Sequence, residues 1–96
     1  MTTLHTISKP PAAGLLEICL PLLKAGDCVL FTEDGVYHCM VDNQLFDSKN
    51  GVKCCVLTED AHARGLKNRL CPKVNLTDTA GYVELCVRFD QVVNWF

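Results

Sequence analysis

The chain has 96 residues, of which 49% are hydrophobic and 7% aromatic, so it fits one domain over residues 1–96 with a modest core of aliphatic and cysteine side chains. Its formal net charge of −2 offers no basic surface for gripping a nucleic-acid backbone, so any connection with RNA is expected to be indirect. The chain begins without the basic flank and apolar segment of a secretory signal, and no run is long enough to cross a bilayer. We therefore expect a cytoplasmic protein without a membrane segment.

The cysteine content is high, with 7 in the chain. A secreted disulfide scaffold would suit such a number, but the odd count and the missing signal favour reduced thiols. Cys54 and Cys55 are adjacent and on a strand would point to opposite faces, which predicts neither a shared metal nor a mutual disulfide. Cys71, in a loop with Arg69 and Lys73, is predicted to be the most exposed thiol. Five cysteines fall inside predicted elements, where they act as small hydrophobes: Cys19, Cys28, Cys39, Cys55 and Cys86.

The first elements are predicted to be a strand and an interrupted helix. Residues 3–7 are rich in β-forming side chains, and the prolines at 10 and 11 end the strand. Residues 12–24 carry a wide apolar stripe at helical spacing, which predicts a helix. Pro21 removes one backbone donor, so we expect a kink there or a last turn that begins anew after Cys19.

Residues 28–32 are an apolar run without polar alternation, which is typical of a strand buried on both faces. We predict that it is the central strand. The acidic pair Glu33 and Asp34 and the breaker Gly35 end it, and a helix is predicted to begin near Val36.

The second half repeats this alternation. Residues 42–51 are polar and predict a loop. Residues 52–58 predict the next strand, and residues 59–64 predict a short helix that Gly65 ends. Residues 73–77 predict the last parallel strand.

The end of the chain is predicted to hold a helix and an apolar tail. Asp78 or Thr79 can cap a helix that runs to Phe89. The tail Q-V-V-N-W-F either folds back onto the sheet or docks its Trp95 and Phe96 on another subunit. The whole pattern predicts an α/β sandwich with a mostly parallel sheet of four to five strands and helices on both faces.

Ligands of open parallel sheets bind beyond the carboxyl ends of the strands, and acidic residues follow three strands here. A phospho-receiver with a phosphorylated Asp34 or Asp60 beside magnesium is one interpretation, but the acidic pair does not follow the first strand as that class requires. Carboxylates that cap the helices are the favoured interpretation.

Other site chemistries find little support. Neither G-x-G-x-x-G nor G-x-x-x-x-G-K-[ST] occurs, so nucleotide binding is not expected. His5, His38 and His62 lack neighbours at metal-ligand spacing, which favours core or surface histidines. No G-x-S-x-G elbow for a serine hydrolase is present. We expect no cofactor and no metal.

Cys19 is the candidate for thiol chemistry. If the helix breaks at Pro21, its thiolate would be exposed and could carry sulfur as a persulfide. The apolar stripe on which Cys19 lies favours instead a buried core cysteine.

The motifs together resemble the TusB/DsrH family. They are L-H-T at 4 to 6, L-E-x-C-L at 16 to 20, G-D-x-V-L at 26 to 30, E-D-G-V-Y at 33 to 37, L-T-E-D-A-H-A-R-G-L at 57 to 66 and D-T-A-G-Y-V-E-L at 78 to 85, with W-F at the end. The resemblance covers nearly the full length. It implies a DsrE-like fold, with three layers, and a small subunit of a cytoplasmic sulfur-relay complex.

In such complexes the resemblance implies two copies each of this chain, a TusC/DsrF-like subunit and a TusD/DsrE-like subunit. Persulfide sulfur passes from a TusA-like donor through the TusD-like subunit to a TusE-like acceptor, toward 2-thiolation of the tRNA wobble uridine. The catalytic cysteine belongs to the TusD/DsrE-like partner, and Cys19 matches a cysteine of DsrH-type members. A DsrEFH-type role in sulfur oxidation and a stand-alone persulfide-carrying enzyme using Cys19 are the alternatives, and the isolated chain is also a candidate for self-association. The interface candidates are Glu33, Asp34, Gly35, Tyr37, Asp60, Arg64, Trp95 and Phe96.

Overall fold

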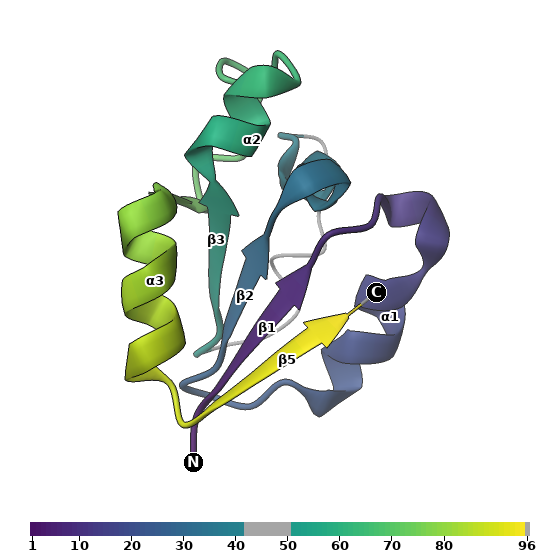
Figure 1. The fold of residues 1–96 in the computed structure, drawn as a ribbon. Helices are drawn as coiled ribbons and strands as arrows, with labels where there is room; N and C mark the ends of the chain where they lie inside the picture. Colours follow the sequence, from purple (N-terminus) through teal and green to yellow (C-terminus); the bar gives the residue numbers. More distant parts are fainter. Residues whose placement is uncertain (42–50, 96) are drawn as a thin grey trace.

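The computed structural model describes residues 1–41 and 51–95, so most of the predicted polar loop and the interface candidate Phe96 lie outside the described residues. The described chain forms a five-stranded sheet in the order β4-β3-β2-β1-β5, and every pairing is parallel (Figure 1). The predicted α/β class is confirmed, and the apolar run predicted to be central is β2, in the middle of the sheet. The strands are β1 (Thr3–Ile7), β2 (Cys28–Phe31), β3 (Lys53–Leu57), β4 (Asn75–Thr77) and β5 (Gln91–Trp95).

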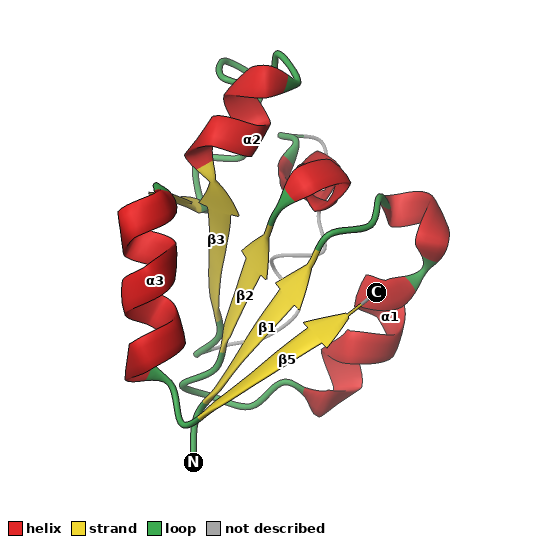
Figure 2. Ribbon diagram, in the orientation of Figure 1, coloured by secondary structure: helices red, strands yellow, loops and turns green. Residues whose placement is uncertain are grey.

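Helices pack on both faces of the sheet, which makes three layers (Figure 2). Successive side chains of a strand point to opposite faces, so β2 sends Val29 and Phe31 into one apolar cluster and Cys28 and Leu30 into another. The larger cluster lies under α1 (Leu15–Cys19), the 3-10 helix η3 (Glu33–Cys39) and α2 (Thr58–Ala63). The smaller cluster lies under α3 (Thr79–Arg88).

The predicted first helix is broken into three short pieces. They are η1 (Pro11–Ala13), α1 and η2 (Leu20–Leu22). The restart predicted after Cys19 is confirmed, because η2 begins at Leu20 with proline in its first turn. The helix extends less far than the apolar stripe predicted, since Gly14 adopts a left-handed φ of 73° and separates η1 from α1.

The segment after β2 differs from its predicted form. The helix begins at Glu33 rather than near Val36, and it is a 3-10 helix that ends at Cys39. Met40 leaves it to form an antiparallel bridge with Leu70. The acidic pair therefore lies in the first turn of η3, where carboxylates interact favourably with the helix dipole.

The second half follows its predicted order, with shifted bounds. The predicted 73–77 strand shortens to β4, and α3 is capped by Asp78, whose carboxylate accepts a hydrogen bond from the Gly81 backbone N–H at 2.7 Å. The tail folds back onto the sheet as β5 and pairs with β1 along its whole length. The last parallel strand is thus β5 rather than β4. Within the described residues, no helix has the length and apolar character needed to span a membrane.

Candidate functional site

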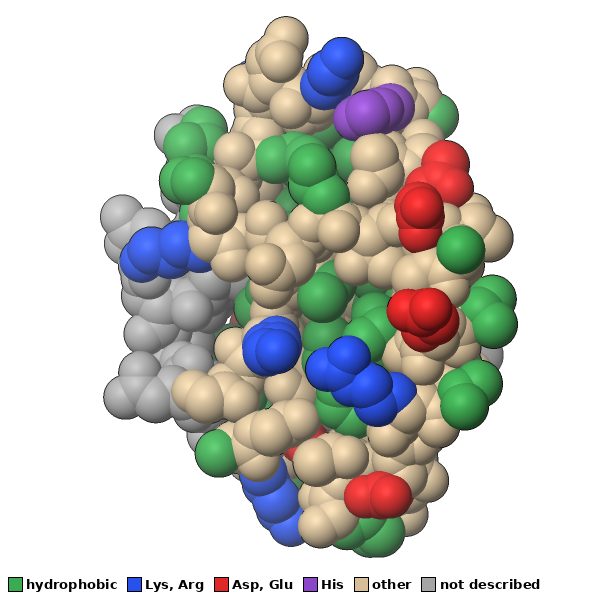
Figure 3. Space-filling model, turned by 90° about the vertical axis from the view of Figure 1, so that its left-hand side faces the viewer, with side chains coloured by type: hydrophobic (Ala, Val, Ile, Leu, Met, Phe, Trp, Pro, Cys, Tyr) green, Lys and Arg blue, Asp and Glu red, His purple; other side chains and the backbone are tan. Residues whose placement is uncertain are grey.

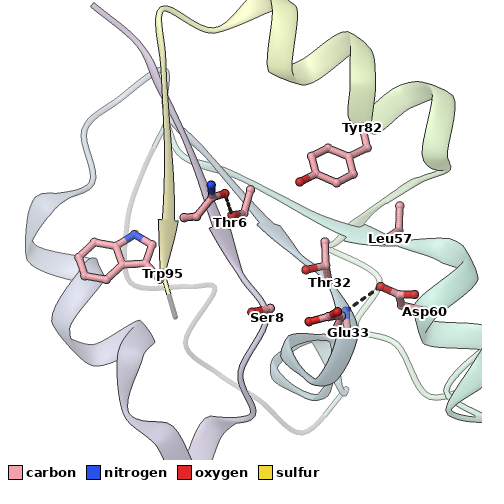
Figure 4. A pocket seen from close by; sticks show the side chains of 9 residues that line it. Thr6, Ser8, Thr32, Glu33, Leu57, Asp60, Tyr82 and Trp95 are labelled. Atoms are coloured by element: carbon pink, nitrogen blue, oxygen red, sulfur yellow. Dashed lines mark hydrogen bonds between the residues drawn. The ribbon is translucent and has the colours of Figure 1, made fainter.

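An open cleft of about 410 Å³ lies at the carboxyl edge of the sheet, where ligands of parallel sheets bind (Figure 4). Its walls come from the ends of β1, β2, β3 and β5, from the first turns of η3 and α2, and from α3. Tyr82 reaches in from α3, while Thr32, Glu33 and Asp60 lie together on the other side. The lining residues are Thr6, Ser8, Thr32, Glu33, Leu57, Asp60, Tyr82, Asn94 and Trp95.

The predicted acidic residues come together at this edge. The Asp60 carboxylate accepts a hydrogen bond of 2.7 Å from the Glu33 backbone N–H, and it ties α2 to the start of η3. Arg64 pairs its Nε with the Asp34 Oδ1 at 3.0 Å and donates to the Asp60 backbone carbonyl at 3.3 Å. We name these four residues, Glu33, Asp34, Asp60 and Arg64, the acidic turn cluster. Because Arg64 neutralises one carboxylate and Asp60 holds a backbone amide, the cluster is organised mainly by its own contacts.

Gly35 sets how closely η3 passes β1. A Cβ on Gly35 would lie 2.0 Å from the backbone oxygen of Ile7, which no side chain can tolerate. Glu33, two residues earlier, adopts a positive φ of 47°, in the sparsely used left-handed region. The E-D-G sequence thus allows a sharp exit from β2 that seats the acidic turn cluster against β1.

Trp95 is half-buried, and contacts within this chain hold its ring in place. Its Nε1 donates a hydrogen bond of 3.1 Å to His5 Nδ1, and the two rings stack with centroids 6.3 Å apart. His5 Nε2, the other ring nitrogen, lies 3.6 Å from a carboxylate oxygen of buried Asp27. Asp27 also accepts from the backbone N–H groups of Thr3 and Lys24. No local sequence pattern predicts this chain of contacts, because its members are distant in the sequence.

Cys19, the predicted persulfide carrier, lies in the larger apolar cluster with 0% of its surface exposed. Burial, followed by the charge of Asp27, raises the pKa of its thiol to about 11. The reactive thiolate is therefore scarce at neutral pH, and solvent does not reach the sulfur in this conformation. A sulfur-carrying role for Cys19 would require α1 to move.

Among the other cysteines, Cys28, Cys39 and Cys55 are buried, while Cys54, Cys71 and Cys86 are half-buried, so Cys71 does not stand out as the exposed thiol that its loop position predicted. All seven cysteines are free, and Cys71 is half-buried because its side chain packs on the larger apolar cluster. Cys54 and Cys55 point to opposite faces, as predicted, and enter different clusters. Burial raises the pKa of Cys54 to about 12. In the described ranges, no group of three or more His, Cys, Asp and Glu side chains is arranged to hold a metal ion.

Several residues of the cleft had no signal in the sequence. Thr6 and Asn94 are joined by a side-chain hydrogen bond across β1 and β5, and Tyr82 projects from α3. Thr6 and Asn94 are expected on the same face of the sheet only when β5 is known to be a strand, because alternate residues of a strand point to the same face. The cleft offers hydroxyls, an amide and carboxylates, which suit hydrogen bonding to a ligand or partner rather than nucleophilic attack.

The described residues define a parallel α/β protein with helices on both faces of its sheet and a polar cleft at the carboxyl edge. The family model described as "DsrH like protein" matches residues 9–92. This chain belongs to the DsrH-like family.

The chain is similar to curated relatives along almost its whole length. Protein TusB of Erwinia tasmaniensis is 33% identical over 94 residues, which cover 96% of this chain and 99% of that protein. Protein TusB of Photorhabdus laumondii is 31% identical with the same coverage.

Solved structures share the fold. Protein Tm0979 from Thermotoga maritima aligns with a TM-score of 0.68 at 17% identity and covers 88% of this chain and 91% of that one. MTH1491 from Methanobacterium thermoautotrophicum, described as a protein of unknown function, aligns with a TM-score of 0.65 at 14% identity and covers 98% and 97%.

Proposed function

We propose that this protein is the small, non-catalytic subunit of a cytoplasmic persulfide-relay complex that supports 2-thiolation of the tRNA wobble uridine. The observation that carries the proposal is the 33% identity to Protein TusB of Erwinia tasmaniensis over 96% of this chain. The burial of Cys19 supports the non-catalytic role, because a relay thiol must meet its donor and its acceptor. The sulfur would then travel on a cysteine of a sister subunit.

The partners in this proposal are a TusC/DsrF-like and a TusD/DsrE-like subunit, two copies of each with two of this chain. TusA-like and TusE-like carriers deliver and receive the sulfur without being permanent members. The net charge of −2 supports the absence of direct RNA contact by this chain. A DsrEFH-type complex in sulfur oxidation is the second candidate, because the family model itself carries the DsrH description.

The acidic turn cluster and Tyr37 are proposed as part of the contact surface with a sister subunit. Asp34 is 57% exposed, and Tyr37 is 37% exposed on the same 3-10 helix. An aromatic ring beside charged groups is the composition typical of interface anchors. Trp95, also an interface candidate, packs on the larger apolar cluster and lines the same cleft as Glu33 and Asp60.

The test is co-expression of this chain with a TusC/DsrF-like and a TusD/DsrE-like subunit from the same organism, followed by purification through a tag on one of them. The purified assembly is loaded with labelled persulfide sulfur, and intact-mass spectrometry locates the label. We expect this chain to co-purify and the label to reside on a sister subunit only. Failure of this chain to co-purify would contradict the proposal that it is a subunit of the complex.

The matched control for the relay role is Cys19→Ser in the same assembly. The non-catalytic proposal expects sulfur transfer to be retained in an assembly that still forms. Label on Cys19, lost together with transfer in the variant, would instead make this chain a relay station. The amount of thiolated uridine is then measured in tRNA from cells that carry the assembly. This measurement distinguishes the thiolation role from the sulfur-oxidation role.

A further inference from the structure

Two cysteines under α3 lie in direct contact, although they are 27 residues apart in the sequence. Cys28 of β2 and Cys55 of β3 bring their sulfur atoms to 3.5 Å, within the smaller apolar cluster. In the strand register Cys28 pairs with Lys53 and Leu30 pairs with Cys55, so the two cysteines are diagonal neighbours on one face. The central strands of the sheet thus place two thiols together without a bond.

The two thiols differ in their access to solvent. A second cleft of about 410 Å³ lies between β4 and α3, and Cys55 lines it together with Thr77, Asp78 and Leu85. Cys28 is not among its lining residues and is 1% exposed. Figure 3 shows the side of the molecule on which α3 lies, with apolar side chains in the middle of the face and basic ones beside them. A small reagent that enters the second cleft therefore meets Cys55 first, with Cys28 behind it.

The surroundings also differ in charge. The hydrogen bond between Cys55 and Cys28 is the largest influence that lowers the pKa of the Cys55 thiol, and the Thr77 side chain, Lys53 and Arg88 lower it further against the effect of burial. The same hydrogen bond and burial raise the pKa of Cys28. Of the two thiols, Cys55 is therefore the one that ionises more readily, and it is also the one that lines the second cleft.

We propose that Cys28 and Cys55 form a reversible dithiol–disulfide site that reacts with small disulfides through the second cleft. The Cys55 thiolate attacks one sulfur of the small disulfide, which forms a mixed disulfide and releases one thiolate. Cys28 gives its proton to that thiolate, and its sulfur attacks Cys55 Sγ, which releases the second thiolate. The two protein thiols are oxidised, and the small disulfide is reduced to two thiols. Closure shortens the sulfur separation to about 2 Å by side-chain rotation and a small strand movement.

The closed bond would join the two central strands of the sheet beneath α3. It would exclude Cys28 and Cys55 from any other thiol chemistry until a reductant reopens it. The site is independent of the proposed membership in a relay complex, since both sulfurs and the cleft belong to this chain alone.

The test uses the full chain, reduced and freed of reductant, with bis(2-hydroxyethyl) disulfide as a small neutral probe. Cys54, Cys71 and Cys86 are first replaced by alanine, because all three are half-buried and would add background adducts. We expect the intact mass to fall by two hydrogens, peptide mapping to locate a Cys28–Cys55 link, and dithiothreitol to reverse it. A link between other cysteines, or no loss of hydrogens at any probe concentration, would overturn the proposal.

Single variants separate the two roles. Cys28→Ala is expected to trap a mixed disulfide on Cys55, while Cys55→Ala is expected to react at neither position. Cys39→Ala is the matched control, because Cys39 is equally buried but lies in the other cluster, and it should leave the Cys28–Cys55 link unchanged. Circular dichroism checks that each variant is folded, and the mapping of the link in the unsubstituted pair does not depend on these variants. An adduct on Cys55 that never closes, with Cys28 present, contradicts the dithiol role.

Discussion

Gly35 is the residue at which backbone packing decides the geometry of the cleft. Its missing Cβ lets η3 pass the Ile7 carbonyl of β1, and the same turn holds the Glu33 amide against the Asp60 carboxylate. The contact at 2.0 Å is with backbone, which cannot rotate away as a side chain can. The sequence marks Gly35 as a strand breaker and an interface candidate but not as a point of close packing, because the neighbour that excludes a side chain is 28 positions away.

Gly35→Ala is expected to destabilise the protein by at least about 3 kcal/mol, because β1 and η3 must separate to admit the methyl group. Urea unfolding followed by circular dichroism measures the change. Gly65→Ala is the matched control, since nothing lies within 4 Å of its Cβ and only its left-handed φ of 72° opposes the substitution. The control should lose about 1 kcal/mol. Equal losses in the two variants would contradict the role assigned to the close approach.

Glu59 joins two helices at the residue scale. Its carboxylate accepts hydrogen bonds from the Thr79 hydroxyl at 2.6 Å and the Thr79 backbone N–H at 3.1 Å, and these contacts lower its pKa from 4.5. A carboxyl group whose pKa is lower in the folded than in the unfolded state stabilises the fold at every pH above its pKa in the unfolded chain. That contribution is lost as the pH falls through the folded pKa.

Glu59→Gln is therefore expected to unfold at a lower temperature than the unsubstituted protein near neutral pH. The difference in melting temperature should shrink as the pH is lowered below 4.5, the ordinary pKa of this carboxyl. Thermal unfolding across a pH series measures it. Glu84→Gln, an exposed glutamate of α3, is the control and should show no such dependence. A difference that stays constant with pH would contradict the assigned contacts.

At the scale of elements, β5 is the strand that the sequence left undecided. The sequence allows the tail either to fold back or to dock on another subunit. In the structure it pairs with β1, and this pairing forms the Thr6–Asn94 and His5–Trp95 contacts. Local pattern does not choose between these outcomes, because an apolar segment gains a similar hydrophobic energy in either place. The presence of an unpaired edge on β1 decides it.

Trp95→Phe is expected to destabilise the protein by about 1–2 kcal/mol, because the ring remains but the buried His5 Nδ1 loses its donor. Urea unfolding provides the measurement. Tyr37→Phe, which removes a hydroxyl from an exposed ring, is the control and should change stability by less than about 0.5 kcal/mol. Removal of residues 91–96 should have a larger effect than either, since it deletes a whole strand. A truncated chain as stable as the full one would show that β5 is not part of the fold in solution.

At the scale of the whole molecule, the acidic turn cluster stabilises the isolated chain little. The Arg64–Asp34 pair is exposed, with 26% and 57% of the side chains accessible, and such ion pairs contribute roughly 1 kcal/mol or less. We propose that the acidic turn cluster acts instead in assembly, where its charges set the orientation of the two subunits and the rate at which they associate.

Arg64→Glu is expected to lower the amount of this chain that co-purifies with tagged sister subunits, while the melting temperature of the isolated chain changes by only a few degrees. Lys67→Glu is the matched control, because Lys67 is exposed three positions further along and makes the same change of charge. Recovery of the Arg64→Glu chain equal to that of the control would remove the cluster from the proposed interface.

The sequence by itself determined the class of fold and the central position of β2, and it limited the cap of α3 to Asp78 or Thr79, because each follows from local periodicity, turn residues or a capping side chain. The family resemblance was also evident from the sequence, since its motifs are short runs of consecutive residues. Only the tertiary structure decided the start of η3, the strand formed by the tail, the burial of Cys19 and the contact of Cys28 with Cys55. Those features depend on residues far apart in the chain, whose approach is governed by packing of the whole sheet rather than by neighbours in sequence.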